Sequence, residues 1–368
     1  MEILLNPIVQ ALLKIVVIML IFVMATGTVL TLMERKWMSA VQDRIGPNRA
    51  NLPFLGNFRG RGALHIAADG LKSIFKEDTM PAGVDVFIFT LAPFFGFISA
   101  IVTWSIIPFA APIGGFAFQI ADVNVGILLV FAVTSLGVYG TVLAGWSSNN
   151  KYALLGAARG TSQMLSYEIF LGLSLVGLFM IHGSVQVSEV VAYQNTYWFG
   201  DVIPKWGVFT QPVAFLIFFT AMLAEAKRLP FDAPEGESEI IAGYFLEYSG
   251  MRWSAFMLAE YIAIVGISAL VVTLFFGGYH VPWLHQDGFR LLGGHLALPI
   301  WLVTIMQVLA FGTKVIFFCW FVIILRWTVP RFRFDQIMEL GWKKMLPLSL
   351  ANIVVTALVL LAIDELNL

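Results

Sequence analysis

The sequence contains a single cysteine, Cys319, and only five histidines. One thiol forms neither an internal disulfide nor a cysteine cage for zinc or an iron–sulfur cluster, so the sequence excludes both. Three of the histidines, His280, His285 and His295, crowd one expected loop, and we interpret them as solvated side chains rather than haem ligands. No nucleotide-binding glycine motif, nucleophile elbow or metal-ligand spacing is found. The sequence therefore predicts no catalytic side chain, metal site or redox centre on this chain.

Charge is also scarce, at 12% of residues, and 22 Lys and Arg are balanced by 23 Asp and Glu. Without a basic excess to replace the counterions around phosphates, no nucleic-acid partner is expected. Apolar residues instead make up 59% of the chain, and the mean hydropathy is +0.85. This composition is typical of a membrane protein. The first apolar run follows Lys14, shows no small-residue cleavage site and ends at the charged triplet Glu34–Lys36, so we interpret it as a membrane span.

A helix that crosses a bilayer needs roughly 20 mostly apolar residues. On that template the sequence predicts an all-α polytopic membrane protein, with residues 1–368 forming a single integral-membrane domain. The eight expected spans lie near 8–32, 84–109, 122–146, 163–182, 209–227, 253–277, 299–326 and 346–363. Eighteen of the 22 basic residues fall in loops that follow odd-numbered spans. Since Lys and Arg accumulate on the cytoplasmic or matrix side, these loops are expected inside and both termini outside.

The first inside loop contains a stretch with helical periodicity, from Gly62 to Phe75. Its apolar residues recur at helical spacing, while His65, Asp69 and Lys72 fall on other faces. The stretch is too short and too charged to span a bilayer. It predicts an amphipathic helix at the inner membrane surface, and packing against a partner subunit is an equally open interpretation.

The segment from Glu225 to Arg252 concentrates charge between two apolar runs. Its six carboxylates are Glu225, Asp232, Glu235, Glu237, Glu239 and Glu247, and its cations are Lys227, Arg228 and Arg252. Pro230 and Pro234 forbid a continuous helix. Beyond Gly236 a helix is expected to resume with Ser238 as its cap, which would bring Glu235 and Glu239 together. Carboxylates held that close exchange protons readily, so the segment favours a proton relay over the alternative of a solvated acidic loop.

Ionisable residues also fall inside expected spans, where each needs a partner, a water-filled cavity or a function. They are the carboxylates Glu168, Glu225 and Glu260 and the cation Lys314. A structural ion pair explains any one of them. Together with the acidic segment, they indicate a membrane protein that handles protons.

Several motifs resemble one known family. The run A-E-A-K-R-L-P-F-D-A-P-E-G-E-S-E-I-I-A-G-Y-F-L-E-Y-S-G, from Ala224 to Gly250, is similar to a loop in the H subunit of bacterial respiratory complex I and its mitochondrial equivalent, subunit 1 of NADH dehydrogenase. The supporting matches are E-R-K at 34–36, D-R-I-G-P-N at 43–48, A-D-G-L-K-S-I-F-K-E at 68–77, S-Y-E at 166–168, A-E-Y at 259–261 and R-W-T-V-P-R-F-R-F-D-Q at 326–336. The resemblance covers residues from about 30 to 350.

This resemblance implies eight core spans and a place where the membrane arm meets the hydrophilic arm of a proton-pumping NADH:quinone oxidoreductase. Quinone, as in ubiquinone-dependent respiration, would be the substrate, with FMN and iron–sulfur clusters confined to partner subunits. The implied proton path comprises Tyr167, Glu168, Glu225, Glu235, Glu237, Glu239, Glu247 and Tyr248. The implied quinone chamber is lined or braced by Arg35, Asp69, Arg228, Arg326 and Arg331.

The resemblance also implies partners and a location. Hydrophilic-arm subunits at the quinone site and small membrane-arm subunits would surround the chain in a bacterial inner (plasma) membrane or a mitochondrial inner membrane. Related chains occur in photosynthetic complex I and membrane-bound hydrogenases, but P-E-G-E-S-E is more similar to the respiratory branch. From the residues alone, a free-standing proton-coupled secondary transporter is the alternative.

Overall fold

The computed structural model describes residues 7–51, 60–114, 116–198, 203–291 and 294–365. In chain order the α-helices are α2 (Pro7–Ile15), α3 (Met24–Val41), α4 (Leu64–Phe75), α5 (Val86–Val102), α6 (Gly126–Ser147), α7 (Lys151–His182), α8 (Val187–Gln194), α9 (Gly207–Thr210), α10 (Pro212–Glu225), α11 (Glu237–Ile240), α12 (Gly250–Phe275), α13 (Ile300–Thr328), α14 (Phe334–Glu339) and α15 (Leu346–Glu365). Short π-helical stretches join α2 to α3 (Val16–Val23) and α14 to α15 (Leu340–Met345).

Seven helical segments within the described residues are long and apolar enough to cross a bilayer. They are Val9–Val41, Val86–Ile106, Gly126–Ser147, Lys151–His182, Gly250–Phe275, Ile300–Thr328 and Phe334–Glu365. The predicted fold class, an all-α polytopic membrane protein, is confirmed. The fifth expected span is the shorter helix α10, with 14 residues.

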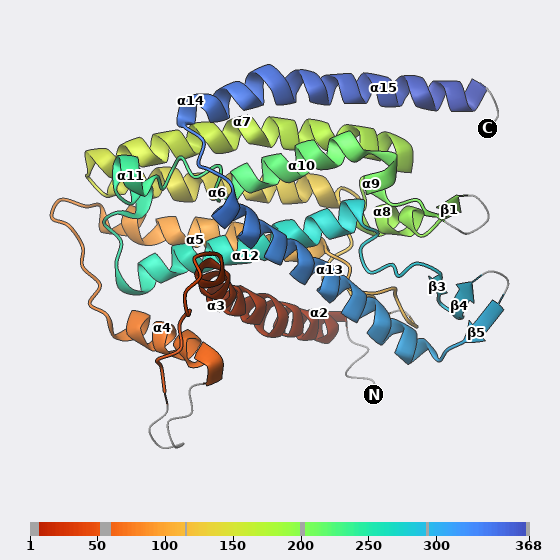
Figure 1. The fold of residues 1–368 in the computed structure, drawn as a ribbon, viewed down its shortest axis with the longest axis horizontal. Helices are drawn as coiled ribbons and strands as arrows, with labels where there is room; N and C mark the ends of the chain where they lie inside the picture. Colours follow the sequence, from red (N-terminus) through yellow and green to blue (C-terminus); the bar gives the residue numbers. More distant parts are fainter. Residues whose placement is uncertain (1–6, 52–59, 115, 199–202, 292–293, 366–368) are drawn as a thin grey trace.

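Helices α7 and α10 lie side by side but differ greatly in length. At about 1.5 Å per residue, the 32 residues of α7 extend about 48 Å, whereas the 14 residues of α10 extend about 21 Å. Beyond Glu225, where α10 ends, a mostly irregular stretch of chain therefore lies alongside the rest of α7. The acidic segment occupies this space at one end of α10 (Figure 1).

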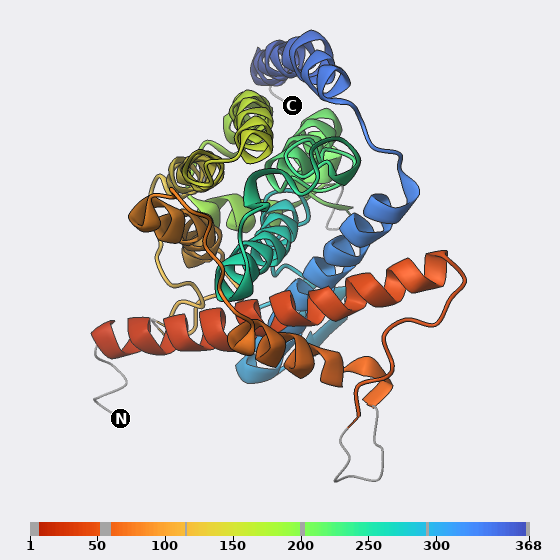
Figure 2. The ribbon, with the colours of Figure 1, turned by 90° about the vertical axis from the view of Figure 1, so that its left-hand side faces the viewer.

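The bundle has a parallel core and two strongly tilted helices. Figure 2 looks nearly along α6, α7, α10 and α12, while α2–α3 and α13 cross the view obliquely. Helix α4 lies apart from the core, beyond the end of α3, and contains no fully buried residue. The predicted helix at 62–75 is thus confirmed as a helix on the outside of the bundle.

The C-terminal helix α15 runs along α7 (Figure 1) and is fastened by side-chain amides. Gln211, just before α10, donates from Nε2 to Thr356 Oγ1 at 2.8 Å, and Asn352 Nδ2 donates to Gln211 Oε1 at 2.9 Å. Gly177 of α7 faces these three side chains, and a Cβ there would lie 3.2–3.3 Å from them. Hydrogen bonds between helices are a common means of association where no hydrophobic driving force acts.

Short strands lie at the end of the bundle opposite the acidic segment. Strand β1 (Tyr197–Trp198) pairs antiparallel with β2 (Ile203–Pro204), and β3 (Leu284–His285), β4 (Gly288–Leu291) and β5 (Gly294–Ala297) form an antiparallel sheet in that order. The end of α15 lies at this same end (Figure 1).

Lys314 of α13 is the mid-span cation noted in the sequence, and its role is structural. Its Nζ donates to the carbonyl oxygens of Phe276 at 2.8 Å, Gly278 at 3.1 Å and His280 at 2.7 Å. These carbonyls follow the C-terminus of α12, where a positive charge is favourable. Lys314 therefore closes the end of α12 and takes no part in the site at the opposite end.

Candidate functional site

The acidic segment between α10 and α12 is mostly irregular, as its prolines predict. Helix α10 ends at Glu225, and only the four residues of α11, from Glu237 to Ile240, are α-helical before Gly250. The prediction that Ser238 caps this helix is wrong, because Ser238 lies inside α11 and Gly236 precedes it. The side chains of Glu237 and Ser238 lie outside the described part of the structure.

Two glycines of α7 make room for the segment. A Cβ on Gly160 would lie 3.1 Å from the ring of Pro234, and one on Gly156 would lie 2.8 Å from Gly243 Cα. These distances show that the irregular chain packs directly against the helix. A larger residue at Gly156 would meet backbone atoms, so the segment would have to shift.

Gln163, one turn further along α7, satisfies backbone groups of the segment. Its Nε2 donates to Ala224 O at 2.7 Å and to Phe231 O at 2.8 Å, and the side chain is fully buried. Irregular backbone inside a membrane protein requires such internal partners. Gln163 therefore fixes where the chain leaves α10 and turns.

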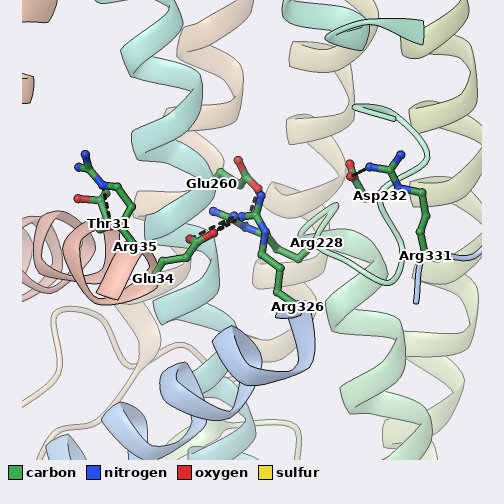
Figure 3. Close-up of polar contacts among 8 residues, drawn as sticks. All are labelled: Thr31, Glu34, Arg35, Arg228, Asp232, Glu260, Arg326 and Arg331. Carbon is green, nitrogen blue, oxygen red and sulfur yellow. Dashed lines mark hydrogen bonds and ion pairs between the residues drawn. The ribbon is translucent and has the colours of Figure 1, made fainter. Parts of the chain in front are cut away.

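A linker between α13 and α14 holds the segment from the other side. Arg331 Nη2 contacts Asp232 Oδ2 at 2.6 Å (Figure 3). In addition, Phe332 N donates to Pro230 O at 3.1 Å. Arg331 was expected to brace the chamber. The structure shows that it braces the acidic segment.

Four charged side chains from different elements converge in a buried cluster (Figure 3). Arg228 Nε lies 2.6 Å from Glu260 Oε1, and Arg228 Nη1 lies 3.4 Å from Glu34 Oε1, while Arg326 also contacts Glu34. The guanidinium of Arg228 stacks over Tyr261, 4.7 Å from the ring centroid, and is 4% exposed. Burial lowers the pKa of Arg228, but Glu260 and Glu34 outweigh it and raise the pKa above its ordinary value. Arg228 is a fixed positive charge.

A large cavity of about 770 Å³ opens beside this cluster, between α3, α4, α12 and the end of α13. Glu34 and Arg326 line it, and so do Arg35 and Asp69, which form an ion pair. Its apolar lining includes Met38, Ile66, Ile74, Met251, Trp253, Met257, Leu258 and Trp327. A mostly apolar cavity with a few charged groups is the usual form of a site for a small apolar molecule with a polar head.

A second, small cavity of about 100 Å³ lies between α5, α6, α10 and α12. Glu225, Lys227, Glu260 and Tyr244 line it, together with hydroxyl groups from α5, the 3-10 turn that follows it, and α6. One water occupies roughly 10–15 Å³ in this measure, so the cavity has room for several. It is suited to water-mediated proton transfer.

Arg228 connects the two cavities. Glu34, on one side of its guanidinium, lines the large cavity, and Glu260, on the other side, lines the small one. A change of charge in the large cavity therefore acts on the small one through a single side chain. The surroundings are buried, so solvent screens this interaction little.

Glu235 and Glu239, which were expected to lie together, have different surroundings in the structure. Glu239 is half-exposed and contacts Arg159 of α7 at 2.6 Å. Glu235 has a buried Oε1 without a hydrogen bond, and burial, helped by Glu260 and Asp232, raises its pKa well above the usual range. The segment thus separates one inward carboxyl group from one that is partly solvated.

Of the other predicted proton-path residues, Glu247 and Tyr248 belong to the acidic segment, whereas Tyr167 and Glu168 lie in the middle of α7. Glu247 accepts a hydrogen bond from Asn150 Nδ2 at 2.7 Å, and Glu168 accepts one from the Ser135 hydroxyl. The two tyrosines donate to backbone carbonyls: Tyr167 to Ile337 O at 2.9 Å and Tyr248 to Phe89 O at 3.1 Å. Their hydroxyls anchor neighbouring elements.

Glu34 and Lys227 belong to the site but were not predicted from the sequence as site residues. Glu260 was predicted only as a carboxylate inside a membrane span. Glu34 was placed just past the first span, but α3 continues to Val41 and carries it into the bundle. The available signal was the spacing of Glu34 and Met38, one helical turn apart on the face that lines the large cavity. The described residues include no group of three or more His, Cys, Asp and Glu side chains arranged to bind a metal.

Comparison with known proteins supports the resemblance over most of the chain. The family model described as NADH dehydrogenase matches residues 13–357. The H subunit of NADH-quinone oxidoreductase from Geobacter metallireducens, in the form numbered 1, is 43% identical over 343 residues, covering 92% of this chain and 93% of that protein. NADH-quinone oxidoreductase subunit 8 of Rhodothermus marinus is 43% identical over 335 residues, covering 90% of this chain and 92% of that protein.

Proposed function

Because the chain belongs to the NADH dehydrogenase family of membrane-arm subunits, we propose that its large cavity is the quinone chamber of NADH-quinone oxidoreductase and its small cavity part of the proton path. As a subunit of this enzyme, the chain couples quinone reduction to proton translocation. The main observation behind this proposal is that Arg228 forms ion pairs with one carboxylate from each cavity, Glu34 and Glu260.

The large cavity fits a quinone in size and chemistry. Its volume of about 770 Å³ lies within the range of about 300–1,000 Å³ usual for ligand pockets. Its apolar walls suit an isoprenoid tail, and its charged groups suit a polar head group. These groups include the ion pairs Arg35–Asp69 and Arg326–Glu34, together with Lys72 and Lys76.

Coupling follows from the fixed charge of Arg228. When quinone is reduced it takes up protons, and the charge near Glu34 changes. The relative strength of the Arg228–Glu34 and Arg228–Glu260 ion pairs then changes, because both carboxylates compete for one guanidinium in a medium of low dielectric. Glu260 lines the small cavity, which has room for several waters, so this shift changes the tendency of the groups there to take up or release a proton.

The proton path proposed from the small cavity includes Glu225, Glu235, Glu239, Glu247 and Glu168. Glu225 lines the cavity, and Glu235 approaches it from the acidic segment. Tyr167 and Tyr248 are positioning residues through their backbone hydrogen bonds, and Glu237 joins the path on the sequence resemblance. Arg331 holds the acidic segment in register through Asp232.

The proposed function also implies partner subunits and a membrane around the chain. Electrons would reach quinone from FMN and iron–sulfur clusters held by hydrophilic-arm subunits. Those subunits would cover the end with α4 and the acidic segment, and small membrane-arm subunits would pack on the bundle. The whole would lie in a bacterial inner membrane or a mitochondrial inner membrane.

The experiment that tests the chamber fills it. Gly70 of α4 lines the large cavity, and a Cβ there would meet nothing within 4 Å. Gly70→Ala, Gly70→Leu and Gly70→Trp therefore add increasing bulk from a Cβ that itself meets no neighbour, and they favour the helix. We expect NADH:quinone activity to fall progressively, to less than a tenth with Trp, while NADH oxidation by ferricyanide stays normal.

Gly312 of α13 supplies the matched control. A Cβ there also meets nothing within 4 Å, and Gly312 does not line the cavity. Gly312→Leu should leave quinone reduction unchanged. Full quinone activity in the Gly70→Trp enzyme, with normal amounts of complex in the membrane, would show that quinone does not use this cavity.

A further inference from the structure

Lys227 stands out because its backbone adopts a conformation that disfavours a side chain. It lies in the turn directly after α10 with φ of +55°, in the left-handed region where glycine or asparagine is usual. Such strain persists only where the surroundings over-determine it, and it concentrates at functional positions. The consequence here is that the Lys227 side chain points inward, to the small cavity.

The ammonium group has defined partners in that cavity. Lys227 Nζ donates to Thr141 Oγ1 of α6 at 2.9 Å and to the Tyr244 hydroxyl at 3.3 Å, and it lies 4.5 Å from the centroid of the Tyr244 ring. Glu225 of α10 and Glu260 of α12 line the same cavity. Lys227 thus lies where α6, α10, α12 and the acidic segment supply polar groups around a space with room for several waters.

The charges that face Lys227 are carboxylates from α10, α12 and the acidic segment. Burial lowers the pKa of Lys227, whereas Glu235 of the acidic segment, Glu260 and Glu225 act in the opposite direction. These opposed effects bring the ammonium and carboxyl groups closer in proton affinity than they are in water. Lysine adapts to burial in this way, and arginine does not.

On the basis of the proposed function, we propose that Lys227 carries an exchangeable proton on the path, between carboxyl groups at the small cavity. A neutral amine takes a proton from a protonated carboxyl group, directly or through a water. The O–H bond breaks as the N–H bond forms, leaving ammonium and carboxylate. The reverse transfer to a different carboxylate completes the step, with no electron exchanged and no change in the net charge of the cavity.

The test compares three replacements in the whole complex: Lys227→Met, Lys227→Arg and Lys227→His. Proton pumping and NADH:quinone activity are measured from pH 5.5 to 8.5, with ferricyanide reduction and the amount of complex as readouts of assembly. Met removes the titratable group, and Arg keeps a charge that does not release its proton. We expect both to lower pumping at least fivefold in assembled complex.

Histidine separates proton transfer from a fixed charge. We expect Lys227→His to restore part of the pumping, with its pH profile displaced to lower pH. Wild-type pumping in the Arg variant would show that only the charge matters and would overturn the proposal. Wild-type pumping in the Met variant, or equal loss of pumping in the His and Met variants, would also overturn the proposal. If the Arg variant does not assemble, the comparison of the His and Met variants decides the question.

The control is Lys344→Met, an exposed lysine of the π-helical stretch before α15, which should leave pumping unchanged. The outcomes also separate this inference from the chamber proposal. If the Lys227 variants pump normally while Gly70→Trp blocks quinone reduction, only the role of Lys227 is wrong. If Gly70→Trp has no effect, the chamber is wrong whatever Lys227 does.

Discussion

Replacing Arg228 with methionine should destabilise the folded protein by about 3–5 kcal/mol, the range found when one partner of a buried ion pair is removed. Arg228 lies 2.6 Å from Glu260 and 3.4 Å from Glu34, and both acids are less than 10% exposed. Coulomb attraction gives a similar size, about 4 kcal/mol for unit charges 4 Å apart at an effective dielectric of 20.

The charge balance of the cluster makes the prediction specific. Glu34 and Glu260 carry two negative charges, and Arg228 and Arg326 carry two positive charges. Arg228→Met leaves one negative charge in excess, whereas Arg228→Met with Glu260→Gln restores the balance. The double variant should therefore recover at least half of the lost stability, although it lacks two charged groups instead of one.

Stability is measured by the amount of complex in membranes and by its thermal inactivation, followed as NADH:ferricyanide and NADH:quinone activity. Arg333→Met is the control, because Arg333 is 71% exposed and its pair with Asp335 is on the surface. A double variant as unstable as Arg228→Met alone would refute the charge-balance reasoning. Normal stability of Arg228→Met would refute the buried pair itself.

Two further predictions concern other parts of the chain. Glu239→Gln or Glu247→Gln should lower quinone-linked pumping severalfold with little loss of complex, since neither packs in the buried cluster; unchanged pumping at normal complex levels excludes them from the path. His280 was interpreted from the sequence as solvated, and this is wrong, because the side chain is buried. It accepts a hydrogen bond from Trp206 Nε1 at 3.2 Å, and burial lowers its pKa to about 3. The unfolded chain binds this proton below about pH 6.5 and the folded chain does not, so the stability from neutral His280 is complete above pH 6.5 and declines as the pH falls toward 3. Inactivation rates between pH 7.5 and 5.0 should rise less steeply in His280→Gln, and identical slopes would contradict this.

Hydropathy predicted the long helices because each is nearly continuous in apolar residues. Hydropathy did not predict where the helices end, because tertiary contacts determine those positions. The first apolar run stops at Leu32, but α3 continues to Val41 because Arg228 and Arg326 compensate Glu34. No local pattern announces a partner nearly 200 positions away.

In the acidic segment, too, local features could be predicted from the sequence, whereas features set by tertiary contacts could not. Pro230 and Pro234 predicted an interrupted helix because proline acts locally. The orientation of Glu235 and Glu239 depends instead on Arg159 of α7 and on the buried groups of the small cavity. A helical periodicity that holds for longer helices says little about a helix of four residues.

The attachment of α15 bears on its position along α7. Helix α15 follows α10 in the chain, so the buried amide of Gln211 gains its partners Thr356 and Asn352 only once α15 has packed on α7. A buried amide without partners is unfavourable, and these hydrogen bonds therefore favour one position of α15 along α7, next to Gly177. A shift of α15 along α7 would break both hydrogen bonds at once, so polar contacts set the register of a helix whose apolar surface alone does not.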